Sequence, residues 1–273
     1  MPGRSAALMV APAKPAATVV LMRDRAQGSG GPEVLLVERH GASSFGAGAY
    51  VFPGGMVEPQ DCSAAALRLS SGLTPEQAAA SLNDLDDPAE AIGYYVAAIR
   101  ETFEEALVLL AEGPEGAAPL PPREELSRTR DRLIANELDF TAWVAGAGLR
   151  LATHRLVYFA HWITPEAVPQ RFSARFFLIQ APREVDVVTD GQEVLRHRWL
   201  QPAEAIALRR QGDIHLMDPT VRNLELLGAF ASTEEALREL NRRAVTAILP
   251  KLTFNPDGSR KLTYPWDADY EHA

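Results

Sequence analysis

The sequence predicts a mixed α/β sandwich. Short apolar runs rich in β-branched residues, which are typical of strands, occur before, between and after stretches with helical periodicity. They do not alternate one for one with helices, as they would in a doubly wound parallel sheet. The chain has 273 residues, of which 47% are hydrophobic and 23% charged. This composition is typical of globular proteins, and the length favours one domain with an elaborated core or a modest extension.

The first predicted elements form a hairpin. The runs Ala16–Met22 and Glu33–Glu38 have strand character, and the glycine-rich segment Gln27–Pro32 separates them. A glycine-rich loop and a brief apolar run follow, and Pro53-Gly54-Gly55 ends that run. The sequence therefore predicts two paired strands, followed by a tight turn.

The central part of the chain is predicted to be largely helical. Thr74-Pro75-Glu76 has the composition of a helix start. A longer helical pattern runs from Ala89 to about Glu112, where we expect Gly113-Pro114 to end it. The remaining predictions are helices over 124–135, 139–145, 202–210 and 219–230, a further helix capped by Ser232, and strands over 156–163, 172–179 and 194–200.

Charge and cysteine content exclude several classes of function. The formal net charge of −9 argues against a nucleic-acid partner, because such proteins normally present a basic face to phosphates. Cys62 is the only cysteine, so the chain has no intrachain disulfide and no cysteine-based zinc site, and a cytoplasmic location is expected. No window approaches the ~20 apolar residues of a membrane span, so we expect no membrane association.

An acidic cluster lies within the long predicted helix. On a helical wheel that starts at Arg100, the carboxylates of Glu104, Glu101 and Glu105 all fall within about 140°. Such a trio either forms a solvated acidic face or holds divalent cations, since carboxylate oxygens suit Mg²⁺. An acidic protein that acts on an anionic substrate needs bound metal ions or local arginines. The opposite face is apolar and contains Ile99, Phe103, Leu107 and Leu110.

The segment upstream makes a family resemblance specific. Phe52-Pro53-Gly54-Gly55 followed later by Arg100-Glu101-x-x-Glu104-Glu105 resembles the Nudix box, G-x5-E-x7-R-E-U-x-E-E-x-G-U, in which U is aliphatic. The resemblance implies a Nudix-type α/β/α sandwich with a mixed β-sheet. We expect residues 1–273 to form a single Nudix domain with a core over about 14–202. An insertion would occupy 62–99 within the box, and a helical extension 203–273.

Three positions depart from the Nudix pattern. Asp61 stands where the pattern has glutamate, which is a mild chemical change. A spacer of 38 residues, 62–99, replaces the seven residues of the pattern and splits the box. Leu107 replaces the glycine that normally ends the helix, and we expect Gly113 to take over this role.

The resemblance also implies a metal site. Glu101, Glu104 and Glu105 would ligate Mg²⁺ or Mn²⁺ together with Gly55 in the turn, and Arg100 would orient a neighbouring carboxylate. These five residues would form most of the catalytic apparatus. The general base is Glu101 in one alternative and, in the other, Glu193, which precedes the strand predicted over 194–200.

A split box after VFPGG is similar to one branch of the family, the peroxisomal acyl-CoA diphosphatases and their bacterial relatives. The segments over 161–165 and 171–177 also resemble that branch. The branch's activity would release a 4′-phosphopantetheine product and adenosine 3′,5′-bisphosphate from CoA or acyl-CoA, and a homodimer is expected from the family. A separate CoA signature, R-x3-G-x3-FPGG, is matched except that Ser44 stands at its arginine. The substrate contacts are predicted to be Arg39, Arg171, Arg175, Phe52 and Gly54.

Two other functions remain open at this stage. The same chemistry could act on ADP-ribose, a dinucleotide or a nucleotide sugar as its small-molecule diphosphate substrate. Alternatively, a Nudix-fold module could bind a nucleotide without hydrolysing it, which Leu107 and the split box favour. Retention of the repulsive trio Glu101, Glu104 and Glu105 argues against a pure binding module. Arg171 and Arg175 could also serve only as partners in structural salt bridges.

Overall fold

The computed structural model describes residues 10–25, 30–42, 46–113, 120–182, 185–255 and 257–272. Its strands are β1 Lys14–Arg23, β2 Glu33–Arg39, β3 Ala49–Val51, β4 Gly54–Met56, β5 Ala111–Glu112, β6 Arg150–Leu151, β7 Val157–Ile163, β8 Phe172–Gln180, β9 Val194–Leu200, β10 His215–Leu216, β11 Ala247–Ile248, β12 Lys251–Phe254 and β13 Arg260–Thr263. Its helices are η1 Pro59–Cys62, α1 Ala64–Leu69, α2 Pro75–Leu82, α3 Pro88–Ala106, α4 Arg123–Ile134, α5 Phe140–Gly146, η3 Thr153–Arg155, α6 Pro202–Gln211, α7 Asp218–Leu227, α8 Thr233–Leu240 and η4 Tyr270–His272.

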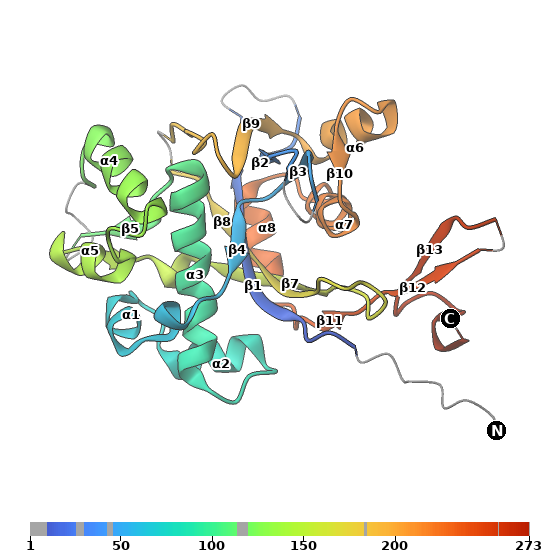
Figure 1. Cartoon of the computed structure of the whole chain (residues 1–273), viewed down its shortest axis with the longest axis horizontal. Helices are drawn as coiled ribbons and strands as arrows, with labels where there is room; N and C mark the ends of the chain where they lie inside the picture. The colour runs from blue at the N-terminus through green and yellow to red at the C-terminus, as the bar shows by residue number, and fades with distance from the viewer. Residues whose placement is uncertain are drawn as a thin grey trace.

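A mixed sheet of nine strands forms the centre of the described structure. Its order is β10-β3-β2-β1-β8-β7-β11, with β4 paired to β1 and β9 paired to β2. The strands β1 and β8 run parallel, whereas β1 and β2 form the predicted antiparallel pair. The helices α1 to α5 lie on one side of this sheet and α6 to α8 on the other (Figure 1). The predicted α/β/α sandwich is therefore confirmed.

The alternation of side chains along β1 builds a core on each face of the sheet. Ala17, Val19 and Leu21 belong to the core that contains α3. Val20 and Met22 point the other way, into the core shared with α7 and α8. Because β1 is apolar on both faces, it reads as a nearly continuous hydrophobic run, as a central strand should. Helix α3 thus packs directly against the strand that also pairs with β4.

Helix α3 begins as predicted but ends earlier than expected. Asp87 caps its start by accepting a hydrogen bond from the Ala89 amide, and Pro88 occupies the first turn. The helix stops at Ala106, where Leu107 adopts a left-handed conformation with φ 55°. The prediction that Gly113 ends this helix is wrong. The apolar residues after 106 leave the helix axis and are buried in the core, so tertiary packing overrides their helical propensity.

The C-terminal part of the chain is only partly helical. Helices α6, α7 and α8 lie where they were predicted, and Ser232 caps α8 by accepting a hydrogen bond from the Glu235 amide. Beyond them the chain forms β11, which joins the main sheet, and the hairpin β12–β13. The hairpin extends away from the sheet (Figure 1). The extension over 203–273 therefore contains strands that its sequence pattern did not indicate.

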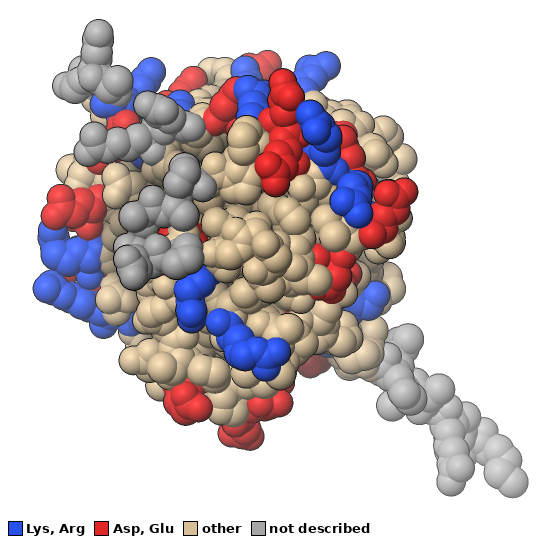
Figure 2. Space-filling view, turned by 90° about the vertical axis from the view of Figure 1, so that its left-hand side faces the viewer, with Lys and Arg blue, Asp and Glu red and all other residues tan. Residues whose placement is uncertain are grey.

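The length of the helices and the distribution of charge on the surface are both relevant to function. None of the helices in the described ranges is both long and apolar enough to cross a membrane. The side of the molecule seen in Figure 2 carries separate small groups of basic and acidic side chains around an uncharged centre. Charges of both signs therefore share this face.

Candidate active site

The turn at Gly54-Gly55 lies against helix α3. Strand β4 pairs Gly54 with Thr18 and Gly55 with Ala17 of β1. A Cβ atom on Gly54, whose φ is 156°, would lie 2.3 Å from the Ala17 carbonyl oxygen. A Cβ atom on Gly55 would lie 2.5 Å from the carboxyl carbon of Glu101. Gly54 is required because the turn passes too close to the backbone of β1 for a side chain, whereas a side chain at position 55 would displace the Glu101 carboxylate.

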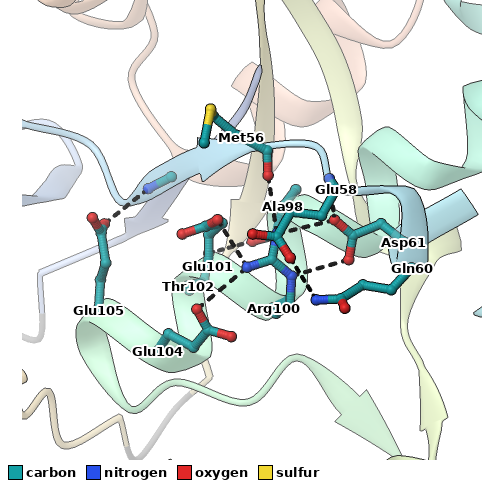
Figure 3. Close-up of polar contacts among 11 residues, drawn as sticks. Met56, Glu58, Gln60, Asp61, Ala98, Arg100, Glu101, Thr102, Glu104 and Glu105 are labelled. Carbon is teal, nitrogen blue, oxygen red and sulfur yellow. Dashed lines mark hydrogen bonds and ion pairs between the residues drawn. The ribbon is translucent and has the colours of Figure 1, made fainter. Parts of the chain in front are cut away.

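Two of the predicted carboxylates meet at this turn. The Gly54 amide donates a hydrogen bond of 2.9 Å to Glu105, whose side chain is buried. Glu101 lies beside Gly55, as the close approach of its carboxylate shows. Figure 3 shows both side chains together with Glu104, which lies about one turn after Glu101 on the same helix. The structure thus brings the helix and the glycine turn together, although 44 residues lie between Gly55 and Arg100 in the sequence.

Arg100 is the centre of the polar network (Figure 3). Its side chain is buried, and it donates from Nε and Nη2 to the two carboxylate oxygens of Asp61, each at 3.0 Å. Nη2 also donates to the Met56 carbonyl oxygen at 2.9 Å. Nη1 donates to Glu101 at 2.8 Å and to Glu104 at 3.3 Å. The guanidinium therefore orients two of the carboxylates that the resemblance assigned to the metal.

Asp61 anchors the part of the box that precedes the insertion. It is fully buried, and its carboxylate accepts a hydrogen bond from the Glu58 amide at 2.8 Å, which closes a capping box at η1. Next to it, Cys62 packs against α3 so closely that a Cβ atom on Gly93 would lie 2.4 Å from the sulfur. The aspartate and Arg100 therefore reunite the two parts of the split motif. The insertion over 62–99 begins in η1 and ends in α3, and these two elements contact each other. The insertion therefore leaves the site intact.

Burial raises the pKa values of all three glutamates. Burial, and after it the neighbouring charge of Glu104, raises the pKa of Glu101 to about 7 despite the opposing effect of Arg100. Burial and the charge of Glu101 raise the pKa of Glu105 well above its ordinary value. Burial likewise raises the pKa of Glu104. Although burial opposes the charge of Arg100, its hydrogen bonds to Asp61 raise its pKa, so it remains a cation.

The donor set fits a hard divalent cation. Carboxylate oxygens are the ligands that Mg²⁺ and Mn²⁺ prefer, and a cation would relieve the repulsion among Glu101, Glu104 and Glu105. Over the described ranges, no three His, Cys, Asp or Glu side chains gather around one point closely enough to chelate an ion as they stand. Arg100 forms ion pairs with Glu101 and Glu104, so these two carboxylates are shared with the guanidinium.

Two further predicted residues lie within electrostatic range of the carboxylates. The charge of Arg39 lowers the pKa of Glu105, and the charge of Glu193 raises it. The Nε atom of Arg39 is buried without a hydrogen-bond partner among the described residues. Strands β2 and β9 bring them together, since the His40 amide donates to the Glu193 carbonyl oxygen at 2.8 Å. Asp190, for which the sequence carries no motif, accepts a hydrogen bond from the Glu193 amide and so holds this loop.

Three predicted substrate residues lie elsewhere. Arg171 donates to the carbonyl oxygens of Thr164 and Ala11 and is buried at the start of β8. Arg175 is buried in an ion pair with Asp84 at 2.6 Å. These contacts match the structural-salt-bridge alternative for Arg175 and a backbone-anchoring role for Arg171. The ring of Phe52 lies in the opposite core, edge-on to Phe176. Ser44, the departure from the CoA signature, falls outside the described residues.

Comparisons with known proteins agree with this geometry. The family model described as the NUDT19 Nudix domain matches residues 5–227. The human acyl-coenzyme A diphosphatase NUDT19 is 30% identical over 261 residues, covering 84% of this chain and 70% of the relative. Its counterpart from Gallus gallus is 29% identical over 280 residues, covering 87% and 74%. A crystal structure of a NUDIX hydrolase from Alicyclobacillus acidocaldarius matches with a TM-score of 0.64 and 29% identity, covering 83% of this chain and 96% of that one. The chain belongs to the NUDT19 Nudix domain family and is a Nudix hydrolase, a diphosphatase.

Proposed function

We propose that this diphosphatase cleaves the diphosphate linkage of CoA or an acyl-CoA. The observation that carries the proposal is the meeting of Glu101 and Glu105 with the Gly54-Gly55 turn inside the VFPGG segment. Two relatives that match most of the chain bear the name acyl-coenzyme A diphosphatase, which supports this substrate class. Water would add to one phosphorus atom as the bridging P–O bond breaks. The products would be a 4′-phosphopantetheine compound and adenosine 3′,5′-bisphosphate.

Nudix hydrolases generally need divalent metal ions. In this chain Glu101, Glu104 and Glu105, with the backbone of Gly55, would hold Mg²⁺ or Mn²⁺. When bound, the metal lowers the pKa of a coordinated water and neutralises charge on the phosphates. The protein's part is to hold these carboxylates in a buried setting, where Arg100 donates to Glu101 and the Gly54 amide donates to Glu105.

The other residues near the carboxylates supply proton transfer and charge. Glu101 or Glu193 would accept the proton of the attacking water, and the Asp190 turn holds the second candidate in place. Arg39 would bind a phosphate oxygen, since its buried Nε lacks a hydrogen-bond partner among the described residues. An arginine suits this role because its guanidinium donates two parallel bonds to a phosphate. Arg100 is already engaged with Asp61 and acts as a positioning residue.

The test is a substrate panel of CoA, an acyl-CoA, ADP-ribose, NADH and a nucleotide sugar, each incubated with Mg²⁺ or Mn²⁺. We expect release of adenosine 3′,5′-bisphosphate from CoA or acyl-CoA at the highest kcat/KM. A preference for another member of the panel would overturn the CoA assignment, and binding without turnover would indicate a module that does not hydrolyse its ligand.

Variants separate the metal assignment from the substrate assignment. Glu104→Gln and Glu105→Gln should each lower kcat by orders of magnitude while the circular dichroism spectrum stays unchanged. Glu124→Gln, an exposed carboxylate on α4, is the matched control and should retain full activity. Near-normal kcat in both site variants would remove these carboxylates from the metal site.

The proposal also includes a homodimer, which the family resemblance leads us to expect. A cytoplasmic location stays a prediction that is based on the single cysteine.

A further inference from the structure

A cavity of about 360 Å³ lies between β7, α7 and the segment that leads into β11. Its lining is mainly aromatic and aliphatic and includes Phe159, Trp162, Leu226, Val245, Ile248 and Trp266. Phe159 and Trp162 belong to the core shared with α7 and α8, whereas α3 packs in the core on the opposite face of the sheet (Figure 1). The cavity is therefore separate from the candidate active site. Ligand pockets usually measure about 300–1,000 Å³, so this one is large enough for a molecule of one or two rings.

Two indole rings line this cavity at a right angle to each other. The centroids of the Trp162 and Trp266 rings are 6.4 Å apart, and the rings are inclined at 90°. Trp266 is 56% exposed, yet its ring stacks on that of Tyr264 with 5.0 Å between centroids and an interplanar angle of 2°. The stacking holds the exposed indole in one orientation. Because aromatic rings bind other rings by offset stacking and by edge-to-face contact, these walls favour an aromatic ligand over an aliphatic chain.

Asn223 on α7 also lines the cavity and carries an unused hydrogen-bond donor. The residue is 2% exposed, and its Oδ1 atom accepts a hydrogen bond from Trp162 Nε1 at 3.2 Å. Since an indole N–H can only donate, this contact fixes the orientation of the amide. The amide nitrogen Nδ2 is then buried and finds no acceptor among the residues that the structure describes. A buried donor without an acceptor is unfavourable, and an acceptor atom of a ligand would remove this cost.

The charged residues of the cavity neutralise each other. Within its described lining, only Arg222 and Glu225 are charged. Arg222 Nη1 forms an ion pair with Glu225 at 3.0 Å, and the guanidinium lies over the ring of Tyr264, 4.7 Å from the centroid. Both charges are thus already engaged within the protein. An uncharged ligand therefore suits this cavity better than an ion.

We propose that this cavity binds an uncharged heteroaromatic molecule, whose ring nitrogen or carbonyl oxygen accepts a hydrogen bond from Asn223 Nδ2. The ring would lie against Trp162 and Trp266. None of the lining residues belongs to the site formed by Glu101, Glu105 and Gly55, so the proposal does not depend on the identity of the hydrolysed substrate. The protein would hold this second small molecule on the face of the sheet opposite to its catalytic helix.

Binding of quinoline to the full chain tests the proposal. At slightly alkaline pH quinoline is an uncharged two-ring molecule with one acceptor nitrogen and no donor. We expect tryptophan fluorescence and ligand-observed NMR to give a dissociation constant below about 1 mM. Trp266→Ala removes one wall from an exposed position and should raise the dissociation constant at least about tenfold. Phe254→Ala, at an exposed aromatic residue outside the cavity, is the matched control and should leave it unchanged.

A second variant tests the hydrogen bond alone. Asn223→Asp keeps the oxygen that accepts from Trp162 but replaces the donor, so quinoline should bind at least about tenfold more weakly. CoA added without a divalent metal should leave quinoline binding to the wild type unchanged, and competition by CoA would overturn the proposal. Absence of quinoline binding up to about 10 mM would also overturn it. So would a dissociation constant that either Trp266→Ala or Asn223→Asp leaves unchanged.

Discussion

At the scale of single residues, the Arg100 side chain connects the two separated parts of the Nudix box. The Arg100 guanidinium divides its donors among Asp61, the Met56 carbonyl oxygen and two glutamates. Only arginine offers enough donors in a fixed planar fork for this arrangement. A lysine would leave several buried oxygens without a donor. The contact is the physical link between residues before and after the insertion.

Gly55 provides the clearest test at the residue scale. In Gly55→Ala the new methyl group would collide with the Glu101 carboxylate, because the Cβ position lies 2.5 Å from its carboxyl carbon. We expect kcat/KM to fall by orders of magnitude, since displacement of a catalytic group by about 1 Å already costs ~100-fold. Gly146→Ala places a methyl group in open space and serves as the control. Equal activities of the two variants would show that the turn does not position Glu101.

The motif and the helical wheel place the carboxylates at 101, 104 and 105 on one helix face, and the structure brings Glu101 and Glu105 of this trio to the glycine turn. Asp84 and Asp190 could not be found in this way, because their importance depends on which strands and loops meet. Arg175 illustrates the difficulty. Its spacing from Arg171 along the chain indicates that both side chains lie on the same face of the sheet. The sequence does not reveal that Asp84 of the insertion forms an ion pair with Arg175. Residues joined by tertiary contacts leave no local pattern.

At the scale of elements, α3 keeps the helix end of the family pattern without the family glycine. Leu107 occupies the position of the family glycine and adopts the left-handed conformation that a glycine would adopt easily. A leucine in this conformation costs about 1–2 kcal/mol. Its side chain is buried in the α3 core, which offsets that cost. The helix therefore ends where the family pattern places its end.

This conformation reverses a usual stability ranking. Within a helix, alanine is more stable than glycine by about 1 kcal/mol, but alanine at 107 would retain the strain of a positive φ. We expect Leu107→Gly to unfold in urea with a free energy about 1 kcal/mol above that of Leu107→Ala. Ala207, exposed within α6, is the control site, where glycine should lower the free energy of unfolding. If Leu107→Ala were instead more stable than Leu107→Gly, the result would argue against a left-handed backbone at position 107.

Other errors at this scale have a common cause. The strands β10 and β11 have two residues each, and β12 and β13 have four. Such segments are too short to display a period, so no sequence pattern distinguishes them from loops. Elements with several periods or clear caps were predicted well, as α2, α8 and β9 show. The length of an element and its capping residues therefore decide whether the sequence predicts it.

At the scale of the whole molecule, a polar cluster of the exposed Asp84 with the buried His161 and Arg175 connects the insertion to the sheet. Asp84 lies between α2 and α3 and pairs with Arg175 at 2.6 Å and with His161 at 3.5 Å. His161 in turn contacts the Ser173 hydroxyl at 2.7 Å, and Arg175 stacks over the ring of Tyr94 on α3. The cluster therefore joins the insertion, two strands and the catalytic helix.

This cluster makes stability depend on pH in a defined direction. Burial and the charge of Arg175 lower the pKa of His161 to about 4, below the value of about 6.5 in the unfolded chain. Between these two values His161 is protonated in the unfolded state but neutral in the folded state. The free energy of unfolding therefore falls as the pH drops from about 6.5 towards 4. From about pH 7 to about pH 5 we expect wild type to lose about 2 kcal/mol more than His161→Gln.

Urea denaturation of both proteins at the two pH values provides this comparison. The effects of the raised glutamate pKa values cancel in the difference, because both proteins retain those groups. His215→Gln, at an exposed histidine on β10, should behave like wild type. An identical pH dependence in wild type and His161→Gln would mean that His161 accepts its proton without penalty in the folded state.

The thiol of Cys62 lies at the contact between the two parts of the Nudix box, so its reactivity depends on that contact. Cys62 is the sole cysteine of the sequence and the last residue of η1, and its sulfur lies against Gly93 of α3. Burial and the charge of Asp61 raise its pKa to about 11, so it offers little thiolate to an alkylating reagent while this contact is closed. Faster alkylation of Cys62 is therefore the expected outcome of a separation of η1 from the helix. The rate of that reaction would report on the contact between the two parts of the split motif.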